Sequence, residues 1–231
     1  TFALPLDADG DGNMDILAGN HGWNSRFQVS EKEPVQLYIG DFDANGTTEQ
    51  ILTYYLQNKE EIFAGKDELQ RQMPGLKKQF LYAQDFAKAS LQQIIPAAKL
   101  KEATLKSASN LSNSILLQPQ PMRFTQQALP WMAQLSTYQD ALQVNANNDS
   151  LPDVVLVGNF FDNTMQMGRN DADFGLLLIN QGNGQFSCET LLGAMVYGES
   201  RKIRSIKLGN RDAMIIARNN AAVMLLAFRQ K

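Results

Sequence analysis

A nine-residue pattern of acidic and amide side chains occurs three times in the chain, each time directly before a short apolar stretch. Asp, Asn or Glu occupies the first, third, fifth and ninth positions of every copy. The repetition constrains the fold strongly, because one local structure has to be built several times from the same kind of unit. The three copies are DADGDGNMD at residues 7–15, DFDANGTTE at 41–49 and NANNDSLPD at 145–153.

The stretches that follow the copies are short and apolar: ILAGN, QILTYY and VVLVGN. Short apolar runs of this kind predict strands. A fourth segment, at 203–228, keeps the rhythm of strand, loop and strand but lacks the acidic residues, and NQGNGQF at 180–186 and a rougher segment at 114–130 predict hairpins. Many short strands in repeated units favour a mainly β fold, and a β-propeller or part of one, of about three to four blades, explains the repetition better than a sandwich.

One segment, residues 59–100, has the composition of helices. Pro74 and Pro96 punctuate it, and proline is tolerated at the start of a helix and disfavoured inside one. We therefore predict two helices inserted between strands of one repeat, within a single propeller-like domain or fragment that covers residues 1–231. The apolar residues that recur at steps of three or four are Phe80, Ala83, Ala87, Leu91 and Ile94.

Composition excludes several classes of partner. The chain is 44% hydrophobic, which supports a globular core, and its net charge of −3 with scattered basic residues argues against nucleic acid and anionic membranes. Cys188 is the only cysteine, so no internal disulfide can form. No stretch reaches the roughly 20 apolar residues of a membrane helix and no signal peptide is visible. Because the chain starts at Thr1 without a methionine, inside an expected strand, we expect further sequence to precede it.

The acidic residues of the first copy point to a bound cation. Four carboxylates crowded into nine residues repel one another by about a few kcal/mol per pair unless a positive charge lies among them. Calcium takes six to eight oxygen ligands in a flexible cage, and glycine allows the tight bends that turn alternate side chains inward. The expected ligands are Asp7, Asp9, Asp11 and Asp15, with the backbone carbonyl of Asn13.

Other metal sites fit less well. An EF-hand would need Glu at the twelfth loop position and a helix after it, but Ala18 and Leu52 occupy those positions and strands are expected there. Magnesium requires a rigid octahedron, and soft metals require His or Cys, of which the chain has one each. Calcium remains. The expected ligands of the second copy are Asp41, Asp43, Asn45 and Glu49, and those of the third are Asn145, Asn147, Asp149 and Asp153.

The number of carboxylates falls from four to three to two along the three copies, so we expect calcium occupancy to fall in the same order. Whether the third copy holds an ion stays open. The alternative explanation is that aspartate, asparagine and glycine simply make good turns. That explanation suits one such loop better than two strongly acidic ones.

The acidic loops and the NQGNGQF hairpin resemble the FG-GAP/VCBS repeats that build calcium-bearing β-propellers, as in the head of integrin α chains. Over most of the chain, the order of acidic loop, helices around MPGLKKQFLYAQDFAKASLQQII, the segment 128–159 and GLLLINQGNGQF is similar to the C-terminal part of bacterial ASPIC/UnbV proteins, of the cartilage acidic protein type. Asn145 and Asn147 depart from the acidic pattern. The resemblance implies a secreted or surface-attached protein, extracellular or periplasmic and often lipid-anchored. We expect missing blades to come from preceding sequence or from a partner chain.

Two functions follow as hypotheses. The preferred one is a non-catalytic module that binds calcium and an unidentified protein or glycan. The alternative is a carbohydrate-active lyase or hydrolase on a propeller, which would need two carboxylates about 5 to 10 Å apart in an open cleft. The motifs of serine hydrolases, P-loop proteins and zinc proteases are absent. Two further residues have ordinary expected roles: His21 in a loop and Cys188 packed on a strand. The loop aromatics are expected to pack between blades or to bind a ligand, and they are Trp23, Trp131, Phe160 and Phe161.

Overall fold

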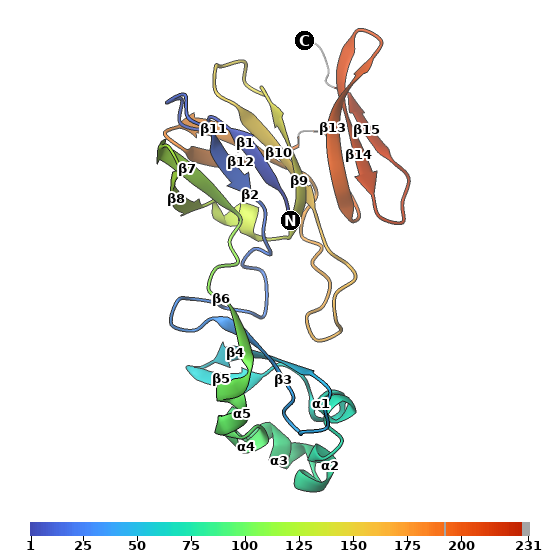
Figure 1. The fold of residues 1–231 in the computed structure, drawn as a ribbon. Helices are drawn as coiled ribbons and strands as arrows, with labels where there is room; N and C mark the ends of the chain where they lie inside the picture. The colour runs from blue at the N-terminus through green and yellow to red at the C-terminus, as the bar shows by residue number, and fades with distance from the viewer. Residues whose placement is uncertain (192, 228–231) are drawn as a thin grey trace. The chain divides into compact units, whose positions relative to one another are not determined.

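The computed structural model describes residues 1–191 and 193–227 and is mainly β, with four antiparallel sheets of three or four strands (Figure 1). The chain divides into two compact units. One unit, Phe27–Asn110, is inserted between the two parts of the other, which are Thr1–Arg26 and the residues from Leu111 onward. Among the described residues, no helix has both the length and the apolar character needed to cross a membrane.

The discontinuous unit contains three sheets, which we call sheets 1, 2 and 3. In sheets 1 and 2 every strand lies beside the next along the chain, and the chain leaves sheet 1 after β2 to form the inserted unit. Sheet 1 contains β1 (Ala3–Leu6), β2 (Asp15–Ala18), β7 (Ser114–Gln120) and β8 (Arg123–Ala128). A 3-10 helix (Trp131–Gln134) leads from sheet 1 to sheet 2. Sheet 2 contains β9 (Tyr138–Val144), β10 (Asp153–Gly158), β11 (Leu176–Gly182) and β12 (Gln185–Thr190). Sheet 3 contains β13 (Ser200–Leu208), β14 (Arg211–Arg218) and β15 (Met224–Ala227).

The alternation of side chains along β10 explains how the three sheets stack. Val154 and Leu156 point into a core shared with Leu17 of sheet 1, whereas Val155 and Val157 point into a second core shared with sheet 3. All six residues of β10 are therefore buried. The first strands β1, β9 and β13 contact one another in chain order. Neighbouring sheets thus pack face to face, and within the described residues they do not close into the ring of a propeller.

The inserted unit has one sheet with the strand order β5-β4-β3-β6. Its core contains Ile51 from the sheet together with Leu69, Phe86 and Ile95 from the helical segment. The strands are β3 (Val35–Gly40), β4 (Glu49–Leu56), β5 (Lys59–Ile62) and β6 (Thr104–Ala108), and the helices between β5 and β6 are α1 (Lys66–Gln72), α2 (Leu76–Gln79), α3 (Ala83–Lys88), α4 (Leu91–Ile94) and α5 (Ala97–Glu102).

The helical segment differs from the two helices predicted for residues 59–100. It begins with a strand, β5, and then forms five short helices. Pro74 and Pro96 lie between helices as predicted, and two additional breaks occur, at residues 80–82 and at Ser90, whose capping box with Gln93 starts α4. Of the predicted apolar stripe, Ala83 and Ala87 are exposed, because α3 turns Phe86 toward the core instead.

The predicted strands and hairpins are confirmed. Each acidic copy leads into a strand, and the 114–130 and 180–186 segments form the β7–β8 and β11–β12 hairpins. Asn183 and Gly184 turn the second hairpin with φ of 53° and 69°, as the Asn-Gly pair predicts. The fourth repeat forms β13 to β15 with only Gly209 and Asn210 between its first two strands, and Phe228 lies outside the described residues.

Candidate metal centre

The three acidic copies form the same structural element. Each is the loop between the first two strands of its sheet: β1 and β2 in sheet 1, β3 and β4 in the inserted sheet, and β9 and β10 in sheet 2. We call them loops 1, 2 and 3. All three end on a strand, which excludes the helix that an EF-hand requires. The residue pairs that close the loops are Leu6 with Asp15, Gly40 with Glu49 and Val144 with Asp153.

The ninth residue of each loop has a buried carboxylate that fastens the loop to its own start. Asp15, Glu49 and Asp153 are at most 2% exposed. In each case one oxygen accepts a hydrogen bond from the backbone N–H of the second loop residue, so the charge is partly compensated by a fixed donor. The bonds are from Ala8 N to Asp15 Oδ2 (2.8 Å), from Phe42 N to Glu49 Oε2 (2.7 Å) and from Ala146 N to Asp153 Oδ2 (2.8 Å).

The other oxygen of this carboxylate distinguishes loop 2 from the other two. In loop 1, Asp15 Oδ1 accepts from the N–H of Gln118 on β7 at 2.7 Å, and in loop 3 Asp153 Oδ1 accepts from Asn180 N on β11 at 2.9 Å. Both carboxylates therefore hold the third strand of their sheet. In loop 2, Glu49 Oε1 instead accepts from the Thr47 hydroxyl at 3.1 Å, within the loop.

The first residue organises the turn in loops 1 and 2. Asp7 accepts hydrogen bonds from Gly10 N (2.8 Å) and Gly12 N (3.0 Å), and Asp41 accepts from Gly46 N (3.0 Å). Gly12 and Gly46 have φ of 87° and 84°, a left-handed conformation that glycine adopts without steric cost. The turn is thus built jointly by the aspartate that accepts the hydrogen bonds and the glycine that donates one of them.

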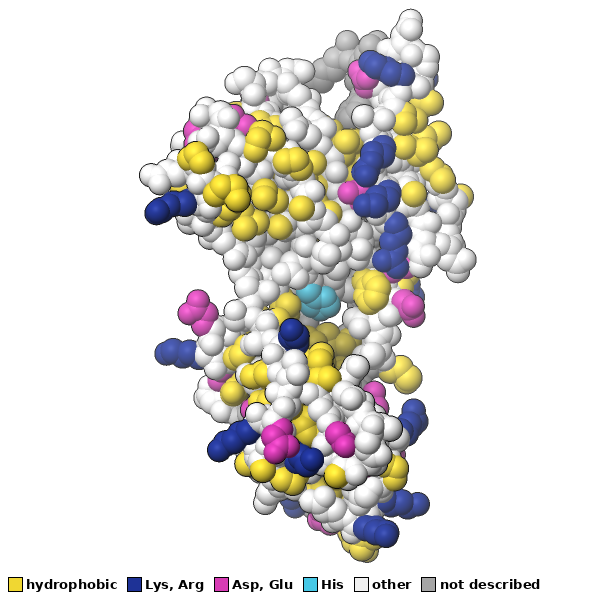
Figure 2. Space-filling model, viewed as in Figure 1, with side chains coloured by type: hydrophobic (Ala, Val, Ile, Leu, Met, Phe, Trp, Pro, Cys, Tyr) yellow, Lys and Arg dark blue, Asp and Glu magenta, His cyan; other side chains and the backbone are white. Residues whose placement is uncertain are grey.

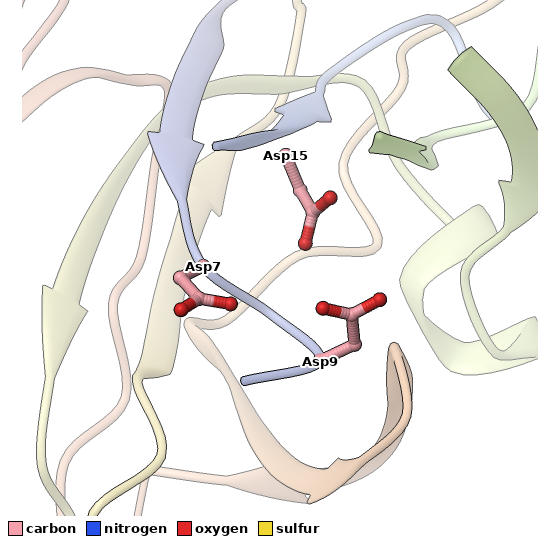
Figure 3. A group of neighbouring side chains, drawn as sticks. All are labelled: Asp7, Asp9 and Asp15. Atoms are coloured by element: carbon pink, nitrogen blue, oxygen red, sulfur yellow. The ribbon is translucent and has the colours of Figure 1, made fainter. Parts of the chain in front are cut away.

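Three carboxylates converge in loop 1. Asp7, Asp9 and Asp15 each offer one oxygen, and these oxygens lie within 4.8 Å of one another. Figure 3 shows the three side chains grouped around a common space, Asp7 and Asp9 from the loop and Asp15 from the start of β2. This arrangement can hold a metal ion, and a set of oxygen ligands suits a hard cation such as calcium.

Loop 2 repeats the arrangement of loop 1. Asp41, Asp43 and Glu49 offer three oxygens that also lie within 4.8 Å of one another. The longer side chain of Glu49 takes the place of the aspartate in loop 1. Loop 2 can therefore hold a metal ion in the same way, although it belongs to the other unit of the chain.

The fifth residue has a different role in the structure. Asp11 is outside the converging group, and its carboxylate accepts hydrogen bonds from Asn13 N (2.7 Å) and Asn13 Nδ2 (2.8 Å). Asn45 Oδ1 likewise accepts from Thr47 N at 2.7 Å. The predicted ligands Asp11 and Asn45 are thus engaged in bonds within their loops, and Asn13, whose carbonyl was the predicted ligand, donates both bonds to Asp11.

Loop 3 repeats the backbone bonds to the third, fifth and ninth residues with fewer charges. Asn147 Oδ1 accepts from Asp149 N at 3.1 Å, and Asp149 Oδ1 accepts from Leu151 N at 2.7 Å. The two asparagines also donate: Asn145 Nδ2 to the Asp149 carbonyl (2.7 Å) and Asn147 Nδ2 to the Asp149 carboxylate (2.6 Å). Among the described residues, no three carboxylates converge here. Loop 3 therefore closes through its own amides.

Electrostatics in loop 1 follow from this geometry. Burial, reinforced by the charges of Asp15, Asp11 and Asp7, raises the pKa of Asp9. The N–H groups of Asn13 lower the pKa of Asp11. Within residues 1–191 and 193–227, no lysine or arginine forms an ion pair with these carboxylates. A bound cation would supply the missing positive charge.

His21 and Cys188 occupy ordinary structural positions. His21 Nδ1 is 3.3 Å from the Thr137 hydroxyl, and burial lowers the pKa of the imidazole. Cys188 is partly buried against the core between sheets 1 and 2, and burial raises the pKa of its thiol. A raised pKa makes the thiol a poor nucleophile at neutral pH.

The loop aromatics do not behave alike. Trp23 and Trp131 are 49% and 66% exposed, so they do not pack between sheets. Phe160 and Phe161 are partly buried and face arginine side chains, with the guanidinium carbon of Arg169 3.9 Å from the centre of the Phe161 ring.

One buried carboxylate lies outside the predicted metal loops, in the charged segment that contains Arg169, Asp171 and Asp173. Asp173 is 3% exposed and accepts hydrogen bonds from Gly158 N (2.8 Å) and Gly175 N (3.0 Å), and burial raises its pKa to about 7. It fastens the end of β10 to the start of β11. The sequence signal was an aspartate two residues before a glycine with positive φ, which is common in turns.

No known family model matches the chain, and comparisons with curated proteins and with solved structures found no match. The resemblance to FG-GAP/VCBS repeats therefore rests on the loop and hairpin motifs themselves. Function has to be argued from the site.

Proposed function

We propose that the chain is a non-catalytic calcium-binding module of a secreted or cell-surface protein, built from propeller-type sheets and acting as a scaffold for a protein or glycan ligand. The observation that carries the proposal is the convergence of three carboxylate oxygens within 4.8 Å in both loop 1 and loop 2. The two clusters have the same position relative to their strands, although their sequences are identical only at the first, third and sixth of the nine positions.

The repulsion between carboxylates in the metal-free loops supports the binding of a cation. Carboxylates this close repel one another by about a few kcal/mol per pair at the effective dielectric of a protein surface. Loop 3 avoids this cost because Asn145 and Asn147 replace the first two carboxylates. Because an amide makes the backbone bond of the third position in loop 3, the charges of Asp9 and Asp43 are not required by the backbone and are available for a ligand.

Calcium fits the ligand chemistry best. The converging atoms are all carboxylate oxygens, and calcium sites of extracellular modules have dissociation constants of about 0.1 to 1 mM. Bound calcium would rigidify the ends of sheet 1 and of the inserted sheet, where a binding surface can be presented on stable loops. No observation in the described residues favours the alternative of a carbohydrate-active enzyme.

Thermal melts test the proposal. We expect the Tm to rise on adding calcium to chelator-treated protein, and to rise less with the same concentration of magnesium, which requires a more rigid octahedral site. Asp9→Asn should reduce the calcium shift, and Asp149→Asn in loop 3 is the matched control that should leave it unchanged. Equal Tm values in calcium and in chelator would overturn the proposal.

A further inference from the structure

Residues 159–173 lie between β10 and β11 and form a loop outside sheet 2, which we call the 159–173 loop. Phe160 and Asn170 pair within it, with hydrogen bonds from Phe160 N to Asn170 O (2.8 Å) and from Asn170 N to Phe160 O (2.9 Å). Met165, between these two residues in the chain, is fully exposed. The loop is therefore folded back on itself, and the residues at its two ends join it to sheet 2.

Asn159 and Asp173 hold the two ends of this loop together. Asn159 Nδ2 donates to the Asp173 carbonyl (2.8 Å), and Asp173 N donates to Asn159 Oδ1 (2.8 Å). The Asp173 carboxylate accepts from Gly158 N and Gly175 N, which lie just outside the loop. All four hydrogen bonds are buried, and we call them the Asp173 clasp.

The charge of Asp173 has no cationic partner. In the part of the chain that the structure describes, its carboxylate forms no ion pair. Figure 2 shows lysine and arginine side chains in a row over β13, and those residues pair with Asp140, Glu199 and Asp212. The two backbone N–H groups of the clasp stabilise the carboxylate less than burial disfavours it, so the pKa of Asp173 rises to about 7.

Ionisable groups on the neighbouring strands leave Asp173 uncompensated. Tyr138 on β9 interacts with the Asp173 carboxylate, and burial raises the pKa of the phenol, so it stays neutral at neutral pH and below. Glu199, just before β13, accepts from Phe161 N (3.1 Å) and from Arg201 (2.7 Å). The charged side chains of the loop itself are exposed, and they are Asp162, Arg169 and Asp171.

His21 contacts the loop through Thr137. The Thr137 hydroxyl accepts from Asn170 Nδ2 (2.7 Å) and lies 3.3 Å from His21 Nδ1. Burial lowers the pKa of the imidazole, so the folded structure favours its neutral form and gains stability as pH rises. His21 and Asp173 therefore give pH dependences of opposite sign.

We propose that the 159–173 loop is a proton-controlled latch, which the Asp173 clasp holds closed while the carboxyl group is protonated and which loss of that proton releases. A protonated carboxyl group keeps lone pairs on both oxygens, so the bonds from Gly158 and Gly175 persist in the closed loop. In the open loop, water hydrates the carboxylate, so ionisation favours opening.

The sign of the pH dependence follows from the raised pKa. The contribution of Asp173 to closure is fully present below its ordinary pKa of about 4 and is lost as pH rises through about 7. The equilibrium constant for opening should therefore rise about tenfold per pH unit across this window and level off above it.

Hydrogen exchange measured by mass spectrometry tests the latch. After division by the intrinsic exchange rate at each pH, peptides that cover residues 160–172 should give an opening constant about 100-fold larger at pH 7 than at pH 5. The helical segment of the inserted unit, residues 66–102, is the internal control and should change far less. An opening constant of the loop that is the same at both pH values would overturn the proposal.

Urea distinguishes release of the loop from unfolding of the whole unit. Local opening exposes little surface, so low concentrations of urea should leave exchange in residues 160–172 unchanged at each pH. A loop whose exchange accelerates with urea as strongly as that of β10 would show global unfolding and would contradict a latch. Measurements with and without calcium separate this result from the calcium proposal, because Asp173 is not one of the loop carboxylates.

Variants assign the effect to Asp173. Asp173→Asn removes the ionisable group and should abolish the rise in opening between pH 5 and 7, whereas Asp171→Asn, exposed in the same loop, is the matched control that should keep it. Retention of the rise in Asp173→Asn would overturn the proposal. If circular dichroism shows that Asp173→Asn does not fold, an NMR titration of the carboxyl carbons in the unchanged chain decides: a midpoint near 7 for Asp173 is expected, and one below about 5 would overturn the latch.

Discussion

Loops 1 and 3 share a backbone and differ in charge. In both loops the third residue accepts a bond from the N–H of the fifth, at 3.2 Å in loop 1 and 3.1 Å in loop 3, and the ninth accepts from the second at 2.8 Å. Loop 3 makes the first of these bonds with asparagine at the third position. The negative charge of Asp9 in loop 1 is therefore not needed to build the loop, which leaves ligand binding as its use, whereas Asp7 also holds the turn through Gly10 and Gly12.

The buried ninth carboxylate is the part that both loops need. Asp15→Ala and Asp153→Ala each leave two N–H groups, one buried and one partly buried, without their charged acceptor, so we expect each to lower the free energy of unfolding by about 2 to 5 kcal/mol in chelator. Urea unfolding measures the loss. In calcium, only Asp15→Ala should lose additional stability. A loss under about 0.5 kcal/mol for Asp153→Ala would show that the carboxylate is not structural.

Calcium itself should have the next largest effect. With a dissociation constant of about 0.1 to 1 mM, 10 mM calcium stabilises the folded state by about 1.4 to 2.7 kcal/mol for each occupied loop. Asp9→Asn and Asp43→Asn should each remove the calcium-dependent stabilisation that one loop contributes. Urea unfolding with and without calcium measures this loss. An unchanged calcium effect in both variants would contradict the assignment of loops 1 and 2.

Loop 3 can be converted to sharpen the comparison. The double variant Asn145→Asp/Asn147→Asp restores the charges of loop 1, so we expect stability to fall by about 1 kcal/mol in chelator and to recover in calcium. The control Asn148→Asp/Ser150→Asp adds the same charge at exposed positions outside the pattern. If the control responds to calcium as strongly as the double variant does, the spacing of the carboxylates has no special role.

The smallest expected effect is a pH dependence in chelator. Because the pKa of Asp9 is raised in the folded protein, protonation favours the folded state, and this contribution is present below the ordinary pKa and is lost as pH rises through the raised value. The Tm of the unchanged chain should therefore fall relative to the Tm of Asp9→Asn as pH increases from about 3 to 6. Saturating calcium should abolish that trend, and a trend of the opposite sign would contradict the crowding of charges in loop 1.

The sequence predicted those parts of the structure that depend on neighbouring residues. The strands after Asp15, Glu49 and Asp153 and the Asn183-Gly184 hairpin follow from short-range patterns, and the structure confirms them. The convergence of the first, third and ninth carboxylates in loops 1 and 2 also follows from spacing within nine residues.

Long-range features were not predictable in this way. The bond from Gln118 to Asp15 joins residues 103 apart, since the inserted unit separates them, and nothing in the local sequence indicates it. The division into two units and the return of β6 beside β3 depend on packing of the whole insert. The five short helices replaced the two expected ones because tertiary contacts, and not a continuous apolar stripe, decide which residues are buried.

Direct measurement of calcium stoichiometry tests the central claim most directly. Isothermal titration of the metal-free chain should show two calcium ions per chain, one in Asp9→Asn, one in Asp43→Asn and none in the double variant. Absence of binding at millimolar calcium, or two ions retained by the double variant, would contradict the claim that loops 1 and 2 are calcium sites.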